Sequence, residues 1–159
     1  MKRLKNLIRE IKKQEYNLLD DFLYEAIFIP EGVEVPSKEI TNQPDLQIYI
    51  ADFGNQNDNC LVAECNGKIV GAVWTRIIND YGHIDNETPS LAISLFKEYR
   101  SLGIGTALMN RMIELLKSKG YKRVSLSVRK ENYAYNLYKK VGFEIIKEND
   151  EDFIMVKQL

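Results

Sequence analysis

The stretch from residue 100 to residue 120, RSLGIGTALMNRMIELLKSKG, decides the fold of this chain. Two glycines, Gly103 and Gly105, stand between a strand-like segment and a run of apolar residues at helical spacing. Glycine lowers helix stability, so two of them at a helix entrance indicate that the backbone itself approaches another group. The apolar stripe predicts an amphipathic helix that ends near Gly120; it consists of Ile104, Leu108, Met112, Leu115 and Leu116.

Hydrophobic periodicity on both sides of this stretch predicts one α/β domain over residues 1–159. Between two apolar runs, Asn66-Gly67 predicts a type I′ turn, because both central residues of that turn need a positive φ. The expected order of elements is β-α-α-β-β-β-α-β-α-β-β. Besides the helix above, strands are expected at 4–11, 60–65, 68–78, 89–96, 122–128 and in a hairpin at 143–159, and helices at 17–27, 44–54 and 132–141.

Composition and charge exclude several classes of function. The chain has 159 residues and a formal net charge of −1, so its overall charge gives no reason to expect a nucleic-acid partner. No apolar run is long enough for a signal peptide or a membrane span, and we expect a cytoplasmic protein without a membrane partner. Cys60 and Cys65 have neither CxxC spacing nor a histidine beside them, which favours buried, reduced thiols over a metal site.

The glycine turn predicts an anion site. A strand that enters such a turn and then a helix points unpaired N–H groups and the positive end of the helix dipole at one spot. A P-loop would need a lysine after Gly105, and a dinucleotide-binding fingerprint would need a small residue in place of Leu108. The pattern R-x-x-G-x-G fits Arg100, Gly103 and Gly105. The remaining alternative is a tight turn in which glycine serves geometry alone.

Two further motifs follow in order. The strand that ends at Val128 has Asn132 four residues on, and L-Y-x-x-x-G-F runs from Leu137 to Phe143. With R-x-x-G-x-G they resemble the GNAT superfamily of N-acetyltransferases, and the resemblance covers residues 67–143 well. It implies a single α+β domain with a mixed, mostly antiparallel sheet, and acetyl-coenzyme A (acetyl-CoA) as cofactor. It also implies an enzyme that acetylates a primary amine of a small molecule or a peptide.

The same resemblance assigns residues to the cofactor. The main chain of Ile93, Ser94 and Leu95 would run along the pantetheine arm, and Asn132 or its neighbour Glu131 would contact the cofactor near the thioester. Tyr138 follows Asn132 by six positions, where seven are common in the family, and Ser127 stands where some members carry a glutamate base. The turn that would hold the pyrophosphate, chiefly through main-chain amides, comprises Arg100, Ser101, Leu102, Gly103, Ile104, Gly105 and Thr106.

Tyr138 is the predicted catalytic residue. Acetyl transfer needs a neutral amine, a donor for the acetyl oxygen, which we expect to be a backbone N–H near Leu95, and a proton for the departing thiolate. The resemblance implies that Tyr138 supplies that proton as a general acid. By position alone Tyr138 would be a core residue, because aromatic residues at helical spacing usually are. Direct transfer needs no protein nucleophile, so neither cysteine has to act.

The acceptor side carries no motif. Glu25, His83, Asp85 and Glu87 are predicted to border it, with the acids as a rim for a cationic amine and His83 or water as a proton relay. Alternatively, these side chains are surface residues or cap turns. A non-catalytic acyl-CoA-binding sensor and a phosphate-ligand domain unrelated to coenzyme A are the competing functions, and the sequence leaves a homodimer open.

Overall fold

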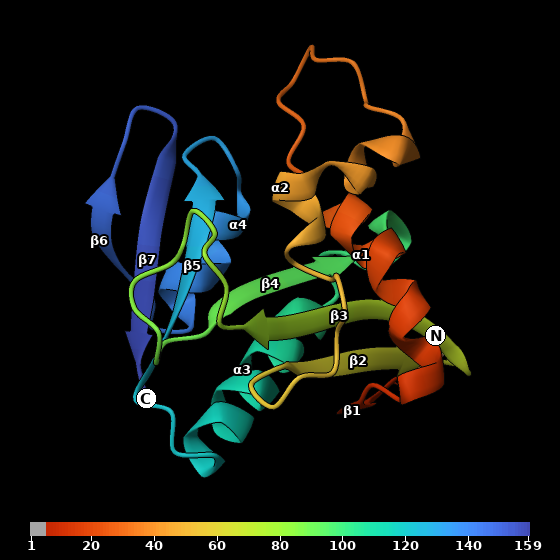
Figure 1. The fold of residues 1–159 in the computed structure, drawn as a ribbon. Helices are drawn as coiled ribbons and strands as arrows, with labels where there is room; N and C mark the ends of the chain where they lie inside the picture. Colours follow the sequence, from red (N-terminus) through yellow and green to blue (C-terminus); the bar gives the residue numbers. More distant parts are fainter. Residues whose placement is uncertain (1–5) are drawn as a thin grey trace.

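The computed structural model describes residues 6–159, in which seven strands form one sheet with helices on both faces (Figure 1). Within these residues the strands lie in the order β1-β2-β3-β4-β5-β7-β6, and β4 with β5 is the only parallel pair of neighbours. This order of elements confirms the prediction; the first two residues of the predicted first strand, Leu4 and Lys5, lie outside the described residues. The elements are β1 (Asn6–Glu10), α1 (Leu19–Ala26), α2 (Pro44–Gln47), β2 (Asn59–Cys65), β3 (Lys68–Arg76), β4 (Ser90–Leu95), α3 (Ile104–Ser118), β5 (Arg123–Arg129), α4 (Ala134–Lys140), β6 (Glu144–Glu148) and β7 (Asp152–Gln158).

The sheet separates two apolar cores. Because side chains alternate along a strand, Val73 of β3 packs toward α3 and α4, whereas its neighbours Ala72 and Trp74 pack toward α1. Cys60 and Cys65 are buried free thiols, as predicted, and they belong to different cores. Burial raises the pKa of both thiols. They therefore act as small apolar side chains on opposite faces.

The helix α3 confirms the predicted apolar stripe. Ile104, Leu108, Met112 and Leu116 are buried in the core on its side of the sheet. The helix ends two residues before Gly120, whose φ of 86° lies in the left-handed region that glycine adopts readily. Across residues 6–159 no helix combines the length and the apolar character that crossing a membrane requires.

The turn at Asn66-Gly67 and the second helix differ in how well the local sequence predicted them. Asn66 and Gly67 have φ values of 51° and 83°, which confirms the tight turn between β2 and β3. The second helix is shorter than expected, since α2 stops at Gln47 instead of continuing to about residue 54. The carbonyl of Ile48 accepts from Arg76 Nη1 at 3.0 Å, and that of Tyr49 accepts from Trp74 Nε1 at 3.1 Å. Side chains of β3 thus form hydrogen bonds with carbonyls that would accept from main-chain amides if the helix were longer.

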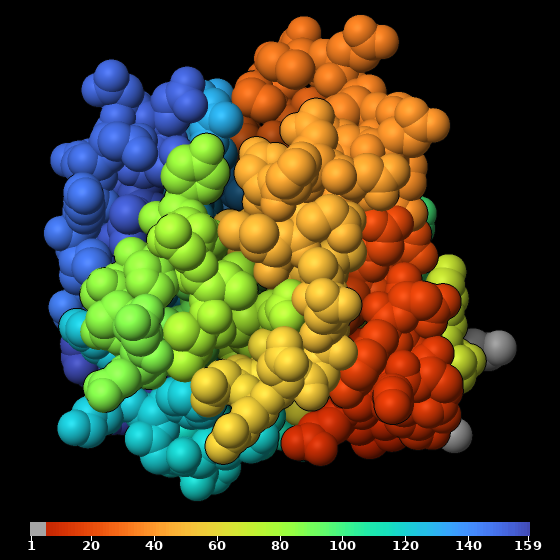
Figure 2. Space-filling view, in the orientation of Figure 1, coloured from red at the N-terminus to blue at the C-terminus, as the bar shows by residue number. Residues whose placement is uncertain are grey.

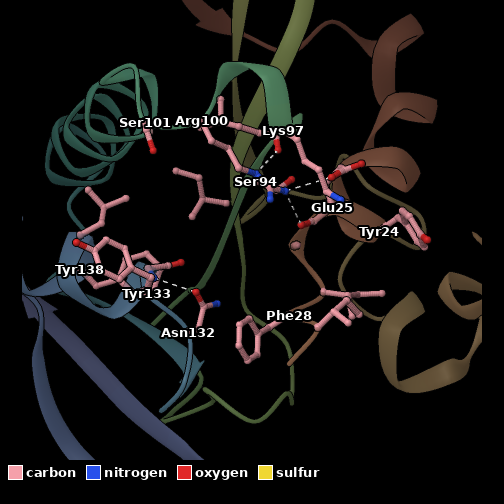
Figure 3. A pocket seen from close by; sticks show the side chains of 18 of the residues that line it. Tyr24, Glu25, Phe28, Ser94, Lys97, Arg100, Ser101, Asn132, Tyr133 and Tyr138 are labelled. Carbon is pink, nitrogen blue, oxygen red and sulfur yellow. Dashed lines mark hydrogen bonds and ion pairs between the residues drawn. The ribbon is translucent and has the colours of Figure 1, made fainter. Parts of the chain in front are cut away.

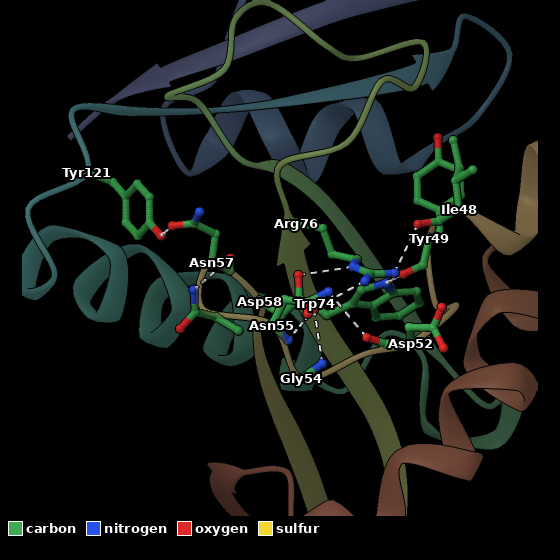
Figure 4. Close-up of polar contacts among 11 residues, drawn as sticks. Ile48, Tyr49, Asp52, Gly54, Asn55, Asn57, Asp58, Trp74, Arg76 and Tyr121 are labelled. Atoms are coloured by element: carbon green, nitrogen blue, oxygen red, sulfur yellow. Dashed lines mark hydrogen bonds and ion pairs between the residues drawn. The ribbon is translucent and has the colours of Figure 1, made fainter.

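A buried ion pair fixes the segment between α2 and β2 (Figure 4). Arg76 Nε lies 3.0 Å from Asp58 Oδ1, and the two side chains are only 7% and 5% exposed. The other carboxylate oxygen of Asp58 accepts from the amides of Gly54 and Asn55, both at 3.0 Å. This network holds an irregular segment against the end of β3 without regular secondary structure.

Candidate active site

Divergence of β4 from β5 leaves one edge of β4 open. These parallel strands are paired at a single position, Ser90 with Ser125. The other edge of β4 pairs with β3, and the amide of Phe96, just after β4, also donates to β3. N–H groups alternate between the two edges of an antiparallel strand, so those of Ile93 and Leu95 face the gap. The gap therefore offers main-chain groups to an extended ligand.

The glycine turn lies directly beyond this open edge. Ser101 and Gly103 have left-handed backbone, with φ of 61° and 86°, and no side chain caps the start of α3. A Cβ on Gly103 would meet nothing within 4 Å, and one on Gly105 would lie 3.5 Å from Leu95 Cδ1 and 3.6 Å from Leu137 Cδ2. The first amides of a helix have no intrahelical partner and carry partial positive charge. The turn therefore presents open space and N–H donors, which suits a phosphate group.

A groove of about 860 Å³ joins the open edge, the glycine turn, α4 and the segment after α1. Figure 2 shows a notch in the surface between the segment after α1, coloured orange, and the C-terminal half of the chain, coloured blue. Figure 3 shows Lys97, Arg100 and Ser101 toward one end of the groove and Phe28 and Asn132 toward the other. Most of the predicted cofactor residues line it: Ile93, Ser94, Leu95, Arg100, Ser101, Gly103, Gly105, Thr106 and Asn132.

The side chains of three predicted cofactor residues point elsewhere. Leu102 is 53% exposed outside the groove, and Ile104 is buried in the core. Ser94 Oγ donates to the carbonyl of Phe22 in α1 at 2.6 Å. For these residues only the main chain is left to contact a cofactor, and that contact stays a prediction.

Tyr138 belongs both to the core and to the groove wall. Its side chain is 8% exposed, and its ring meets that of Phe143 edge-on with centroids 6.2 Å apart. It also lines the groove. Burial raises the pKa of Tyr138 to about 12, so the hydroxyl stays protonated at neutral pH. The two interpretations of this residue are compatible.

Asn132 caps the helix that carries Tyr138. Its Oδ1 accepts from the amide of Ala134 at 2.9 Å, which satisfies a donor at the start of α4. The neighbouring Glu131 also lines the groove, but its carboxylate is well exposed and lies 3.9 Å from Arg129. Asn132 therefore has a positioning role for α4 in addition to any contact with a ligand.

The predicted acidic rim is not assembled as one cluster. Glu25 lines the groove and is paired with Arg100, at 3.1 Å between Oε2 and Nη2. Asp85 pairs instead with Arg123 at 2.5 Å, and it also accepts from the amide of Glu87. These contacts lower the pKa of Asp85 to about 2. Asp85, Glu87 and His83 lie on the loop between β3 and β4, outside the groove lining.

His83 is placed by its own loop. Its Nδ1 lies 2.9 Å from the carbonyl of Ile78. The same loop is attached to β4 through Ser90 Oγ, which donates to Asp80 at 2.8 Å. His83 therefore serves at least as a contact within the loop, and its proposed proton relay stays a prediction.

Sequence reasoning did not find the apolar wall of the groove. Between α1 and the next helical turn, the segment 26–36 contributes six lining residues, and Tyr133 of the β5–α4 connection adds a ring that is 85% exposed. The unbroken apolar run after α1 was the available signal, because a solvated loop would not need it. The six are Ala26, Ile27, Phe28, Ile29, Val35 and Pro36.

The open edge of β4, the glycine turn and the groove are the arrangement expected of a class of protein that binds an extended, phosphate-bearing ligand. Residues 16–143 match the model of the acetyltransferase (GNAT) family, and the chain belongs to that family. Acetyl-CoA is the acetyl donor that this family uses.

Three relatives illustrate the similarity. An N-alpha-acetyltransferase of Sulfurisphaera tokodaii is 37% identical over 95 residues, which are 54% of this chain and 56% of that protein. The crystal structure of a PaiA N-acetyltransferase from Thermoplasma acidophilum in complex with coenzyme A has a TM-score of 0.72 at 22% identity, covering 98% of this chain and 99% of that one. The ribosomal-protein-S18-alanine N-acetyltransferase of Escherichia coli has a TM-score of 0.70 at 20% identity, covering 97% and 94%. The match to the curated relative thus spans little more than half of its length, whereas the solved structures share the whole fold.

Proposed function

We propose that this protein is an acetyl-CoA-dependent N-acetyltransferase that transfers the acetyl group directly to a primary amine. The observation that carries the proposal is the single pairing between β4 and β5 beside a glycine turn, with Tyr138 in the wall of the same groove. Family membership supports the reaction class. The two buried, unpaired cysteines support a reducing compartment such as the cytoplasm.

Main-chain groups would hold most of the cofactor. The amides of residues 101–106 suit the pyrophosphate, because Gly103 leaves open space where any other residue would place a side chain. Lys97 adds positive charge at that end of the groove, next to the ion pair of Arg100 with Glu25. The open edge of β4 at Ile93 and Leu95 suits the amides of the pantetheine arm, as an added strand would.

When bound, acetyl-CoA supplies an activated acetyl group as a thioester. Leu95 is the residue to which we assign the donor for the acetyl oxygen. Its N–H faces the gap beside β4, and its carbonyl accepts from Arg100 Nε at 3.0 Å, which fixes the backbone at the end of β4. Tyr138 is the donor for the departing sulfur, because its raised pKa keeps the proton on the hydroxyl. Asn132 orients Tyr138 through the start of α4.

The acceptor is a primary amine of a small molecule or a peptide. Two relatives support an amine as the acceptor group: one is named as an N-alpha-acetyltransferase and the other as acting on an alanine of a ribosomal protein. They do not indicate which molecule carries the amine in this case. A non-catalytic acyl-CoA-binding sensor remains the second candidate, since the glycine turn and the open edge would serve binding alone.

A two-step experiment separates these candidates. The first step measures the melting temperature with acetyl-CoA and with acetyl-pantetheine, which lacks the nucleotide; we expect a larger rise with acetyl-CoA. The second step follows free thiol in the presence of a panel of primary amines. Stabilisation without amine-dependent thiol release would favour the sensor, and no stabilisation at all would reject the cofactor site.

A further inference from the structure

The groove has two chemically different ends. Lys97 and Arg100 lie at the glycine-turn end, whereas Phe28 and Asn132 lie toward the opposite end, which is called the apolar end below. The apolar side chains of segment 26–36 and the ring of Tyr133 also line the groove. Within the described part of the chain only two acids line the groove, Glu25 and Glu131. Glu25 is committed to Arg100 at 3.1 Å, and the Glu131 carboxylate is 64% exposed. The apolar end therefore has no buried, unpaired carboxylate to receive a second positive charge.

The apolar wall is fixed before any ligand arrives. Tyr24 Oη donates to the carbonyl of Pro36 at 2.5 Å, which ties the far end of segment 26–36 back to α1. Within the segment, the amide of Val33 donates to the carbonyl of Pro30 at 3.1 Å. Val35 remains 60% exposed although it lines the groove. Exposed apolar side chains on a preorganised segment indicate a surface that a ligand covers.

We propose that the acceptor is a small primary amine carried on an apolar group, which lies against Phe28, Val35 and Tyr133. This inference rests on the proposed function and specifies its substrate. Phe28 reaches the groove from the segment after α1, and Tyr133 reaches it from the start of α4 (Figure 3). A groove of about 860 Å³ that must also admit the cofactor arm leaves room for a small amine.

Apolar surroundings also assist the chemistry. Desolvation disfavours an ammonium ion, so the pKa of an amine bound at this end falls toward the neutral form that attacks. In the reaction a C–N bond forms and the C–S bond breaks; the amine loses a proton and the leaving sulfur gains one. An acidic rim would have the opposite effect on the amine, because a carboxylate stabilises the ammonium.

The test compares hexylamine with cadaverine, which have equal length and differ in carrying a terminal methyl or a second ammonium. Phenethylamine is the aromatic probe. With saturating acetyl-CoA, we expect kcat/KM for hexylamine and phenethylamine to exceed that for cadaverine by about tenfold or more, because burying their apolar groups contributes binding free energy that a second ammonium does not. Equal or better use of cadaverine would overturn the inference. A lack of turnover with every amine would instead reject the proposed function.

Substitutions in the groove test where the apolar part of the acceptor amine binds. Phe28→Ala and Tyr133→Ala should raise the KM for phenethylamine about tenfold and leave the KM for acetyl-CoA unchanged. Ile146→Ala is the matched control, since Ile146 is 55% exposed on β6 and lies outside the groove. A raised KM for acetyl-CoA alone would assign the two rings to the cofactor and contradict the inference.

Two alternative occupants give distinct results. Faster transfer from butyryl-CoA than from acetyl-CoA would mean that the apolar end receives the acyl chain, and faster acetylation of a peptide that begins with phenylalanine than of phenethylamine would contradict a small acceptor. We expect neither.

Discussion

Glu25 and Arg100 stand 75 positions apart in the chain and meet at the groove, where Glu25 Oε2 lies 3.1 Å from Arg100 Nη2. The same guanidinium donates through Nε to the carbonyl of Leu95 at 3.0 Å. One side chain thus connects the end of α1, the end of β4 and the glycine turn. The carboxylate of Glu25 is consequently occupied by Arg100, which removes it from the acidic rim that the sequence suggested.

Replacing Glu25 by glutamine therefore should not discriminate among acceptors. Because the carboxylate neutralises Arg100 and the pair is partly exposed, we expect kcat/KM to change by less than about fivefold, equally for cadaverine and hexylamine. Steady-state kinetics with both amines provide the measurement. A selective loss on cadaverine would show that Glu25 binds the acceptor.

The glycine turn can be tested with a control of equal backbone strain. Gly103 and Gly120 both have a φ of 86° and open space where a Cβ would lie. Gly103→Glu should abolish the rise in melting temperature caused by acetyl-CoA, because a carboxylate would enter the space of the pyrophosphate and repel it. Gly120→Glu carries the same conformational cost at the far end of α3, and we expect it to keep the full rise. Equal responses of the two variants would refute the anion site.

The hydroxyl of Tyr138 should matter for turnover and not for binding. Tyr138→Phe keeps the ring packed against Phe143 and removes only the proton donor. General acid catalysis is typically worth about 10²–10⁴-fold, so we expect kcat to fall within that range while the melting-temperature rise with acetyl-CoA is kept. Unchanged kcat in this variant would return Tyr138 to a purely structural role.

The raised pKa of Tyr138 predicts a particular pH dependence. Tyrosine ionises near pH 10 in an unfolded chain, and burial raises the pKa of Tyr138 to about 12 in the fold. The folded state therefore keeps this proton longer, and the stability that results is present below about pH 10 and is lost as the pH rises from there toward 12. Activity should climb on the alkaline side as the amine deprotonates, without a decline caused by Tyr138 below about pH 10. The pH profile of kcat for the wild type and for Tyr138→Phe measures this dependence. A decline of the wild-type kcat at pH 8 that the variant lacks would contradict the raised pKa of Tyr138.

The ion pair between Arg76 and Asp58 predicts a large effect on stability. Asp58→Ala leaves a buried guanidinium without its partner and also removes the acceptor for the amides of Gly54 and Asn55. We expect the free energy of unfolding to fall by about 3–5 kcal/mol, measured by denaturant titration. The comparison is Lys117→Ala, which breaks an exposed pair 3.8 Å long with Glu114 and should cost about 0–1 kcal/mol. Similar losses in the two variants would disprove the structural role of the pair.

Sequence patterns correctly predicted those elements that depend on residues close together in the chain. The Asn66-Gly67 turn, the stripe of α3 and the glycine turn each depend on backbone preferences of the residues that form them. The length of α2 could not be predicted in this way, because Arg76 and Trp74 of β3 bind the carbonyls of the two residues that follow the helix, Ile48 and Tyr49. The partner of Glu25 was equally hidden, since only the folded chain brings Arg100 beside it. The apolar lining of the groove was missed for the same reason, since the fold alone brings the segment after α1 close to Tyr133, just before α4.

The release of thiol from acetyl-CoA on addition of a primary amine is the decisive measurement of acetyl transfer by this protein. With catalytic amounts of the protein and a panel that includes hexylamine and phenethylamine, we expect free thiol and acetylated amine to appear in equal amounts, and a tertiary amine to yield neither. Stabilisation by acetyl-CoA without thiol release in the presence of any primary amine would contradict the proposed acetyl transfer and would indicate a non-catalytic acyl-CoA-binding protein.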